Sequence, residues 1–161
     1  MERQEIIKLV ETHAGNFCLD AKFVSAIISV ESSFNQWAAR FEPDFFKRYL
    51  EGKSISRFGS ISLEPERVMR ATSFGLMQAM GQVAREHGFQ GTFLTELCNP
   101  DTGIMYGCKY LAWLKSKLSS DAHVDFNILA AAYNGGLGAV KGGKISNPEY
   151  PERVYAVMKA L

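Results

Sequence analysis

The chain has 161 residues, of which 47% are hydrophobic and 22% charged, and its formal net charge at pH 7 is +1. This length is typical of one domain with its own core, and the balanced charge excludes the basic surface of a nucleic-acid-binding protein. The N-terminus carries charges at positions 2, 3 and 5, and no apolar run approaches the roughly 20 residues of a membrane span, so we expect neither a Sec-type signal nor a transmembrane segment.

Apolar residues recur at helical spacing in the N-terminal part of the sequence. A first helix is predicted over residues 5–13, and the Ala-Gly-Asn that follows is expected to end it. Asp20 is the expected N-cap of a second helix over residues 21–32. Its i, i+4, i+7 and i+8 positions form one apolar ladder that ends in an acid: Phe23, Val24, Ile27, Ile28 and Glu31.

The stretch 38–72 has the least regular pattern and is interpreted as an insertion between two stronger segments. It predicts a short helix opened by Pro43, then a loop or small hairpin at SISRFGSIS. A second short helix is expected after it, with Pro65 in the first turn.

Helical spacing returns from residue 75. GLMQAMGQVAREHG predicts a helix that ends at Gly88, and residues 99–118 predict a long helix. A buried helix is expected over residues 124–136, ended by its two final glycines, and a short one over 151–161. The apolar stripe of the long helix consists of Ile104, Cys108, Leu111, Leu114 and Leu118. The sequence therefore predicts a mainly α protein with one domain over residues 1–161.

Cysteines and histidines are too scattered to indicate a metal site or a disulfide framework. They are Cys18, Cys98, Cys108, His13, His87 and His123. We interpret them as structural thiols and surface imidazoles, and we expect no metal and no cofactor.

Glu31 is an acidic residue on an otherwise apolar helix face. It follows Ile27 by one turn and Val24 by two, so a straight helix carries its carboxylate toward the core. A buried carboxylate costs several kcal/mol unless it is protonated or hydrogen-bonded, so its presence there suggests that it is used. The structural alternatives are that Glu31 is exposed to solvent at the end of the helix, or that it pairs with an arginine.

Two further segments combine small or flexible residues with polar groups. SFGLMQ, residues 73–78, places Gly75 before an uncharged Leu-Met-Gln, which also fits a helix start with a packed methionine. AAAYNGG, residues 130–136, places Tyr133 and Asn134 before a glycine pair, which also fits a glycine C-cap.

The order of E-S, G-L-M-Q and A-Y-N-x-G, over residues 20 to 160, resembles the soluble-type (SLT) lytic transglycosylases, with the goose-type lysozymes as near relatives. The resemblance implies a lysozyme-like domain with a substrate cleft that cleaves the β-1,4 bond between N-acetylmuramic acid and N-acetylglucosamine in peptidoglycan glycan strands. Glu31 matches the single catalytic acid/base and Ser73 a hydroxyl near the N-acetyl group of the substrate. Gln78 with the Met77 backbone matches a glycan contact, Tyr133 the hydroxyl that orients the acid, and Asn134 a sugar-binding amide.

A protonated Glu31 suits this chemistry, because cleavage needs a proton for the leaving oxygen and a glutamate in water is ionised at neutral pH. Burial of the carboxyl raises its pKa. The resemblance implies that the N-acetyl group and C6 hydroxyl of the substrate replace a second carboxylate, which gives 1,6-anhydromuramoyl ends. A monomer is expected.

Alternatives remain open at this point. The segment 38–72 brings additional carboxylates, and one of them facing Glu31 would make an inverting muramidase. These are Glu42, Asp44, Glu51, Glu64 and Glu66. Glu42 is the first candidate because Pro43 restrains its backbone, while pairing with Arg40 or Arg48 is its structural explanation. A chitinase and a non-catalytic glycan-binding phage tail component are the other possibilities.

We expect the protein to act at the bacterial cell wall. It would reach the wall by phage delivery, as an endolysin or virion lysin, by another secretion route, or as a mature form from which a signal has been removed.

Overall fold

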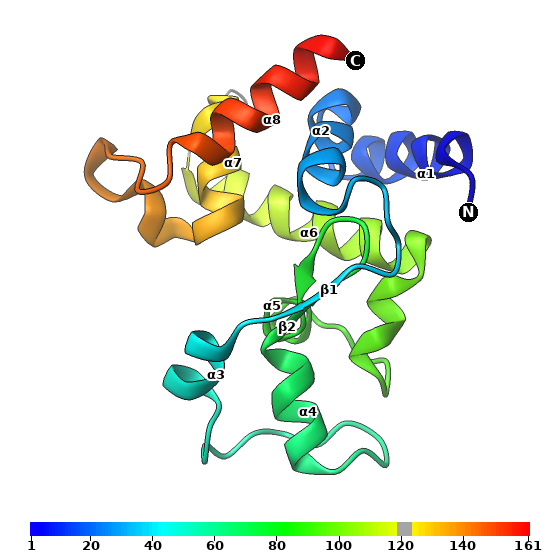
Figure 1. Cartoon of the computed structure of the whole chain (residues 1–161), viewed down its shortest axis with the longest axis vertical. Helices are drawn as coiled ribbons and strands as arrows, with labels where there is room; N and C mark the ends of the chain where they lie inside the picture. Colours follow the sequence, from blue (N-terminus) through cyan, green and yellow to red (C-terminus); the bar gives the residue numbers. More distant parts are fainter. Residues whose placement is uncertain (119–123) are drawn as a thin grey trace.

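The structure is a computed structural model that describes residues 1–118 and 124–161, and it is mainly helical, as predicted (Figure 1). His123 lies outside the described residues. The elements in chain order are α1 (Arg3–Asn16), α2 (Ala21–Ser32), β1 (Ala39–Phe41), α3 (Pro43–Tyr49), α4 (Leu63–Arg70), β2 (Thr72–Phe74), β3 (Ala79–Met80), α5 (Gly81–Glu86), the 3-10 helix η1 (Leu94–Cys98), α6 (Pro100–Leu118), α7 (Phe126–Gly135), the 3-10 helix η2 (Leu137–Gly143) and α8 (Glu149–Ala160).

The larger half of the molecule is a helical cluster. Helix α1 packs on α2 and α6, and α8 packs on α2 and α7, as Figure 1 shows. Their apolar faces meet in one core that includes Ile6, Val10, Phe23, Val24, Ile27, Ile104, Cys108, Leu111 and Leu114. The predicted stripe of α6 is confirmed in this core, with Leu118 partly buried at its end. Each buried aliphatic side chain contributes roughly 1.5–3 kcal/mol, so this core holds the helices in fixed positions.

The ends of the first two helices follow from local contacts. Helix α1 runs to Asn16, three residues past its predicted end, because fully buried Ala14 continues the face of Ile6 and Val10. That burial outweighs the weak helix propensity of glycine and asparagine. Asp20 caps α2 as predicted, since its Oδ1 accepts a hydrogen bond from the Phe23 N–H over 2.9 Å.

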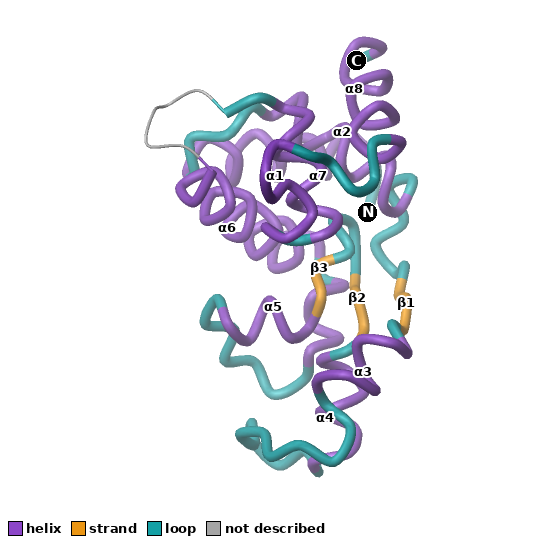
Figure 2. The backbone as a smooth tube through the Cα atoms, turned by 90° about the vertical axis from the view of Figure 1, so that its left-hand side faces the viewer, coloured by secondary structure: helices purple, strands orange, loops and turns teal. Residues whose placement is uncertain are grey.

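The smaller half contains a three-stranded antiparallel sheet of order β1-β2-β3, which the sequence analysis did not predict (Figure 2). The helix expected from residue 75 begins instead at Gly81, and residues 75–78 form the turn between β2 and β3. Gly75 and Gln78 have φ values of 73° and 48°, which a right-handed helix does not accept. A Cβ at Gly75 would lie 2.3 Å from the carbonyl oxygen of Leu97, so this turn requires glycine.

Helices α3 and α4 lie in the irregular segment, where both predicted helices are confirmed and SISRFGSIS is a loop. Below the sheet in Figure 2, α4 packs on α5 through a buried ion network. The fully buried Glu66 accepts hydrogen bonds from Arg70 Nε at 2.9 Å and Arg85 Nε at 2.8 Å. The same arginines donate to the carbonyls of Ser56 and Phe89, so the network anchors the loops on both sides of the helix pair.

Across the described residues, each helix falls short of the length or the apolar character that crossing a bilayer requires.

Candidate active site

A cleft of about 440 Å³ lies along the junction of the two halves. Its wall combines residues from the helical cluster with residues from the sheet and α3. Those that bear polar or aromatic groups are Glu31, Arg40, Glu42, Phe45, Ser73, Gln78, Tyr106, Tyr110, Tyr133 and Asn134. Five of the residues singled out in the sequence therefore meet in one place: Glu31, Ser73, Gln78, Tyr133 and Asn134.

Glu31 lies in the last turn of α2 and is half-buried in the wall of the cleft. Burial is the largest influence on its carboxyl and raises the pKa of Glu31 above the ordinary value. The hydrogen bond from Tyr150 and the positive charges of Arg40 and Arg153 oppose this pKa shift, and the negative charge of Glu42 adds to it. The balance favours a carboxyl group that keeps its proton at higher pH than a glutamate in water.

The serine after Glu31 fixes the end of α2 against the β2–β3 turn. Ser32 Oγ donates to the carbonyl of Leu76 over 2.8 Å, which joins the E-S and G-L-M-Q segments directly. Ser33 and Phe34 then adopt φ values of 51° and 63°, and this left-handed turn ends the helix and directs the chain toward β1. The carboxylate is therefore held by an anchored helix end.

The polar groups of the β2–β3 turn are partly used to build it. Gln78 Nε2 donates to the carbonyls of Ala38 and Gly75, both at 3.0 Å, while its side chain lines the cleft. Ser73 lies in the central strand opposite Arg40 and borders the cleft. Asn134 accepts a hydrogen bond from Asn147 Nδ2 at 3.0 Å, and it also borders the cleft.

Comparison with known proteins places this arrangement in a family. The model of the transglycosylase SLT domain matches residues 8–155. The chain belongs to the transglycosylase SLT domain family. A comparison with curated protein sequences found none that matches the chain.

A solved structure shows the same fold. It is the X-ray structure of an inactive Glu-to-Gln variant of lytic transglycosylase Slt from Pseudomonas aeruginosa, with a TM-score of 0.64 and 20% sequence identity. The match covers 94% of the present chain and 23% of that protein, so the chain spans about a quarter of its length. The lysozyme-like fold expected for an SLT domain is thereby confirmed. The matching family model describes a transglycosylase domain.

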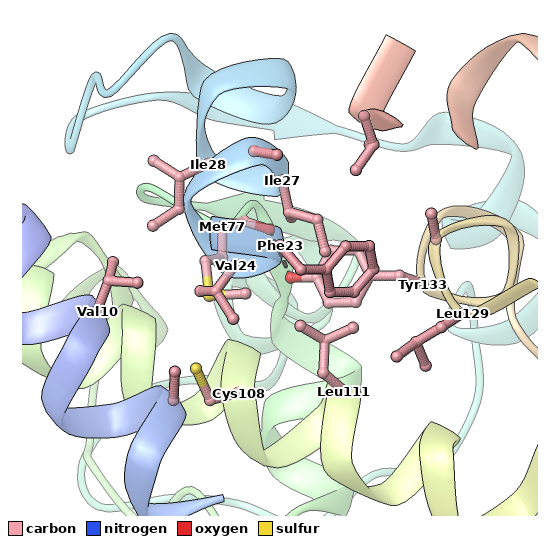
Figure 3. Close-up of a cluster of buried hydrophobic side chains, with 14 of the residues drawn as sticks. Val10, Phe23, Val24, Ile27, Ile28, Met77, Cys108, Leu111, Leu129 and Tyr133 are labelled. Atoms are coloured by element: carbon pink, nitrogen blue, oxygen red, sulfur yellow. Dashed lines mark hydrogen bonds between the residues drawn. The ribbon is translucent and has the colours of Figure 1, made fainter. Parts of the chain in front are cut away.

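Two residues expected at the site of this SLT domain contact each other. The Met77 side chain is fully buried against Gly107, and the Met77 carbonyl accepts a 2.7 Å hydrogen bond from the Tyr133 hydroxyl. This bond ties Tyr133 to the β2–β3 turn, and the expected roles of Tyr133 and of the Met77 backbone in glycan cleavage stay predictions. Figure 3 shows the Tyr133 ring pointing from α7 into the cluster around Val24 and Ile27.

The hydroxyl that contacts the acid belongs to Tyr150 in α8, a residue the sequence analysis missed. Its O–H donates to Glu31 Oε1 over 2.7 Å, and burial raises the pKa of Tyr150, so it remains a donor throughout the ordinary pH range. An aromatic residue in a short amphipathic helix carries no distinctive sequence signal. Only the packing of α8 on α2 brings the two side chains together.

The carboxylates of the 38–72 segment separate into two groups. Glu42 lines the cleft and is bonded by Arg40 Nε at 2.6 Å, so both its expected cleft position and its expected arginine pairing are present. Glu66 is enclosed by its arginines and Glu64 pairs with Arg67. Asp44 and Glu51 are exposed and do not line the cleft, so Glu42 is the carboxylate of this segment that does. The described residues contain no cluster of three or more His, Cys, Asp or Glu side chains arranged to hold a metal ion.

Proposed function

We propose that this SLT domain cleaves the β-1,4 bond between N-acetylmuramic acid and N-acetylglucosamine with Glu31 as the single acid/base, leaving 1,6-anhydromuramoyl ends. The observation that carries the proposal is the environment of Glu31. Its carboxyl is half-buried in the cleft wall, has a raised pKa and accepts a fixed hydrogen bond from Tyr150. A general acid that works near neutral pH requires such a raised pKa.

In the first step, the Glu31 carboxyl gives its proton to the glycosidic oxygen as the bond from this oxygen to C1 of the muramic acid breaks. The N-acetyl oxygen of the substrate supplies electrons to C1 and replaces an enzyme nucleophile. In the second step, the C6 hydroxyl attacks C1 and the bond from the N-acetyl oxygen to C1 breaks, which restores the N-acetyl group. Glu31, now ionised, takes the C6 hydroxyl proton and is again protonated. Tyr150 donates to the ionised carboxylate between the steps, which is the state that its hydrogen bond stabilises.

A second candidate is an inverting muramidase in which Glu42 activates a water molecule. The position of Glu42 in the same cleft favours it. Its hydrogen bond with Arg40 weighs against it, because the guanidinium already engages the Oε1 atom of Glu42.

Digestion of purified sacculi followed by mass spectrometry of the released fragments tests the proposal. Anhydro ends support it, reducing ends support the muramidase, and cleavage of chitin with inert sacculi supports a chitinase. The matched control is Glu31→Gln, which keeps the shape and the Tyr150 contact and should lower cleavage roughly 10²- to 10⁴-fold. Unchanged cleavage by this variant contradicts the role of Glu31, and glycan binding without cleavage by the wild type supports a binding module.

The setting follows from the substrate. We propose that the protein acts at the bacterial cell wall as a monomer, and that a phage delivers it there. That residues 38–72 form an insertion within this single domain stays a prediction.

A further inference from the structure

A second hollow of about 290 Å³ adjoins the cleft, and the two share Val83 and Tyr110 in their walls. Its remaining lining comes from the end of α5 and the residue after it, from α6 and from η2, and consists of Glu86, His87, Trp113 and Leu137. The proposed bond cleavage uses none of these side chains. The hollow is therefore a lateral extension of the cleft.

Three aromatic rings form one wall of this hollow. The ring centres of His87 lie 5.4 Å from Tyr110 and 5.2 Å from Trp113, and those of Tyr110 and Trp113 lie 5.9 Å apart. Burial lowers the pKa of His87; the negative charge of Glu86 opposes this shift and the positive charge of Lys109 adds to it, so the neutral imidazole is favoured. The wall thus presents aromatic faces and no positive charge of its own.

Glu86 supplies the one charged group of the lining. Gln82 Nε2 donates to its Oε1 over 2.8 Å, which restrains the carboxylate at the rim of α5. Its negative charge raises the pKa of Tyr110, secondary to burial, which places the carboxylate within electrostatic reach of the aromatic wall. Lys117 Nζ lies 5.9 Å from the centre of the Trp113 ring but outside the lining residues, so this ring already faces one ammonium group.

A restrained carboxylate beside electron-rich ring faces is complementary to a cation, because both attract positive charge and the rings do so without strong hydration. A neutral sugar would use the rings and gain little from the carboxylate. We propose that this hollow, formed by Glu86, His87, Tyr110 and Trp113, binds a primary ammonium group of the peptidoglycan strand. Two sources carry that group: the side chain of a diamino acid in the peptide stem, and a glucosamine that has lost its acetyl group. The inference rests on the proposed function for the identity of the strand.

The chain offers an internal control for a direct binding test. It contains two tryptophans, and Trp37, with 72% of its surface exposed, lines neither the cleft nor the hollow, whereas Trp113 is 37% exposed. In an NMR titration of the full chain with n-butylammonium chloride, the indole signal of Trp113 should shift and that of Trp37 should not. Neutral N-butylacetamide should move neither, and Glu86→Gln should remove the shift. Equal shifts with the amine and the amide, or no shift at all, would overturn the inference.

Kinetics identify the source of the amine. On native sacculi, Glu86→Gln should raise the apparent KM roughly three- to tenfold with kcat unchanged, and on sacculi with acetylated amines it should match the wild type. Removal of the peptide stems by an amidase should abolish the Glu86 effect if the stem carries the amine, and should preserve it if the sugar does. The charge-matched control is Glu11→Gln on the exposed face of α1.

The two proposals fail separately in this experiment. Equal wild-type rates on native and acetylated sacculi would overturn the ammonium site while the cleavage proposal stands. A wild type that cleaves neither substrate would overturn the proposed function, and with it the assignment of the amine to peptidoglycan. If Trp113→Leu cleaves native sacculi more slowly and Glu86→Gln does not, the hollow binds a neutral sugar ring and not an ammonium group, which overturns the inference.

Discussion

The Tyr150 hydroxyl donates a 2.7 Å hydrogen bond to Glu31 Oε1, across 119 positions of sequence. The bond joins α8 to the last turn of α2, and it holds a carboxyl that lines the cleft and has a raised pKa. It fixes the position of the Glu31 carboxyl and links α8 to the wall of the cleft.

Tyr150→Phe removes this donor and leaves the ring. Because the hydrogen bond favours the ionised carboxylate, we expect the pKa of Glu31 to rise further in the variant and the alkaline limb of the kcat profile to move to higher pH. Loss of a hydrogen bond to a charged group should lower kcat roughly 10- to 100-fold. The pH–rate profile on solubilised glycan strands measures both effects.

Tyr133→Phe is the control for that experiment. It removes the bond to the Met77 carbonyl and should cost about 1–3 kcal/mol of unfolding free energy, with the pH profile unchanged. A shifted pH profile in Tyr133→Phe and an unshifted one in Tyr150→Phe would reverse the two assignments.

Glu31 should reduce the stability of the folded chain at neutral pH. Burial raises its pKa above the value in the unfolded chain, so the native state binds more protons between these two pKa values. The free energy of unfolding therefore falls as pH rises through this window and stays low above the folded pKa. Glu31→Gln cannot ionise, so at pH 7 it should be more stable than the wild type by about 0.5–2 kcal/mol.

Urea unfolding of both proteins at pH 7 and pH 3 measures this difference. It should vanish at pH 3, where Glu31 is protonated in the folded and unfolded chains alike. The same difference at both pH values would mean that packing, and not ionisation, causes it.

Glu42→Gln separates the two catalytic schemes. Removing this negative charge lowers the pKa of Glu31 and leaves Arg40 without its carboxylate, so the alkaline limb should move to lower pH. With Glu31 as the single acid/base, activity should change by less than about tenfold and the products should keep their anhydro ends. A loss above about 10²-fold, together with reducing ends in the wild type, would assign Glu42 as the base.

Glu66→Gln should destabilise the smaller half severely. The carboxylate is fully buried between Arg70 and Arg85, and its removal leaves two buried guanidinium groups without their counter-charge. The expected cost is about 3–5 kcal/mol in thermal or urea unfolding. The control is Glu64→Gln on the same helix, whose carboxylate is 71% exposed and should cost below about 1 kcal/mol. Equal losses of unfolding free energy in the two variants would show that the buried ion pairs of Glu66 contribute little to stability.

Helices with long apolar stripes were predicted correctly. The stripe of α6 and the ladder of α2 repeat over several turns, so burial of one face was readable from spacing alone. The β2–β3 turn was predicted as helix because its sequence is uncharged and apolar. Its conformation depends on left-handed residues and on the approach of Gly75 to Leu97, a contact between segments distant in sequence.

The sequence by itself determined that Glu31 lies on an apolar helix face and that Ser73, Gln78 and Asn134 belong to the same family pattern. These features are local, since each depends on helical periodicity or on a short run of residues. Only the tertiary structure decided that Tyr150 holds the acid, that Tyr133 holds the Met77 carbonyl, and that Glu42 rather than Glu66 faces the cleft. Hydrogen bonds and desolvation depend on distances between elements, and periodicity along one chain does not specify which element packs against which.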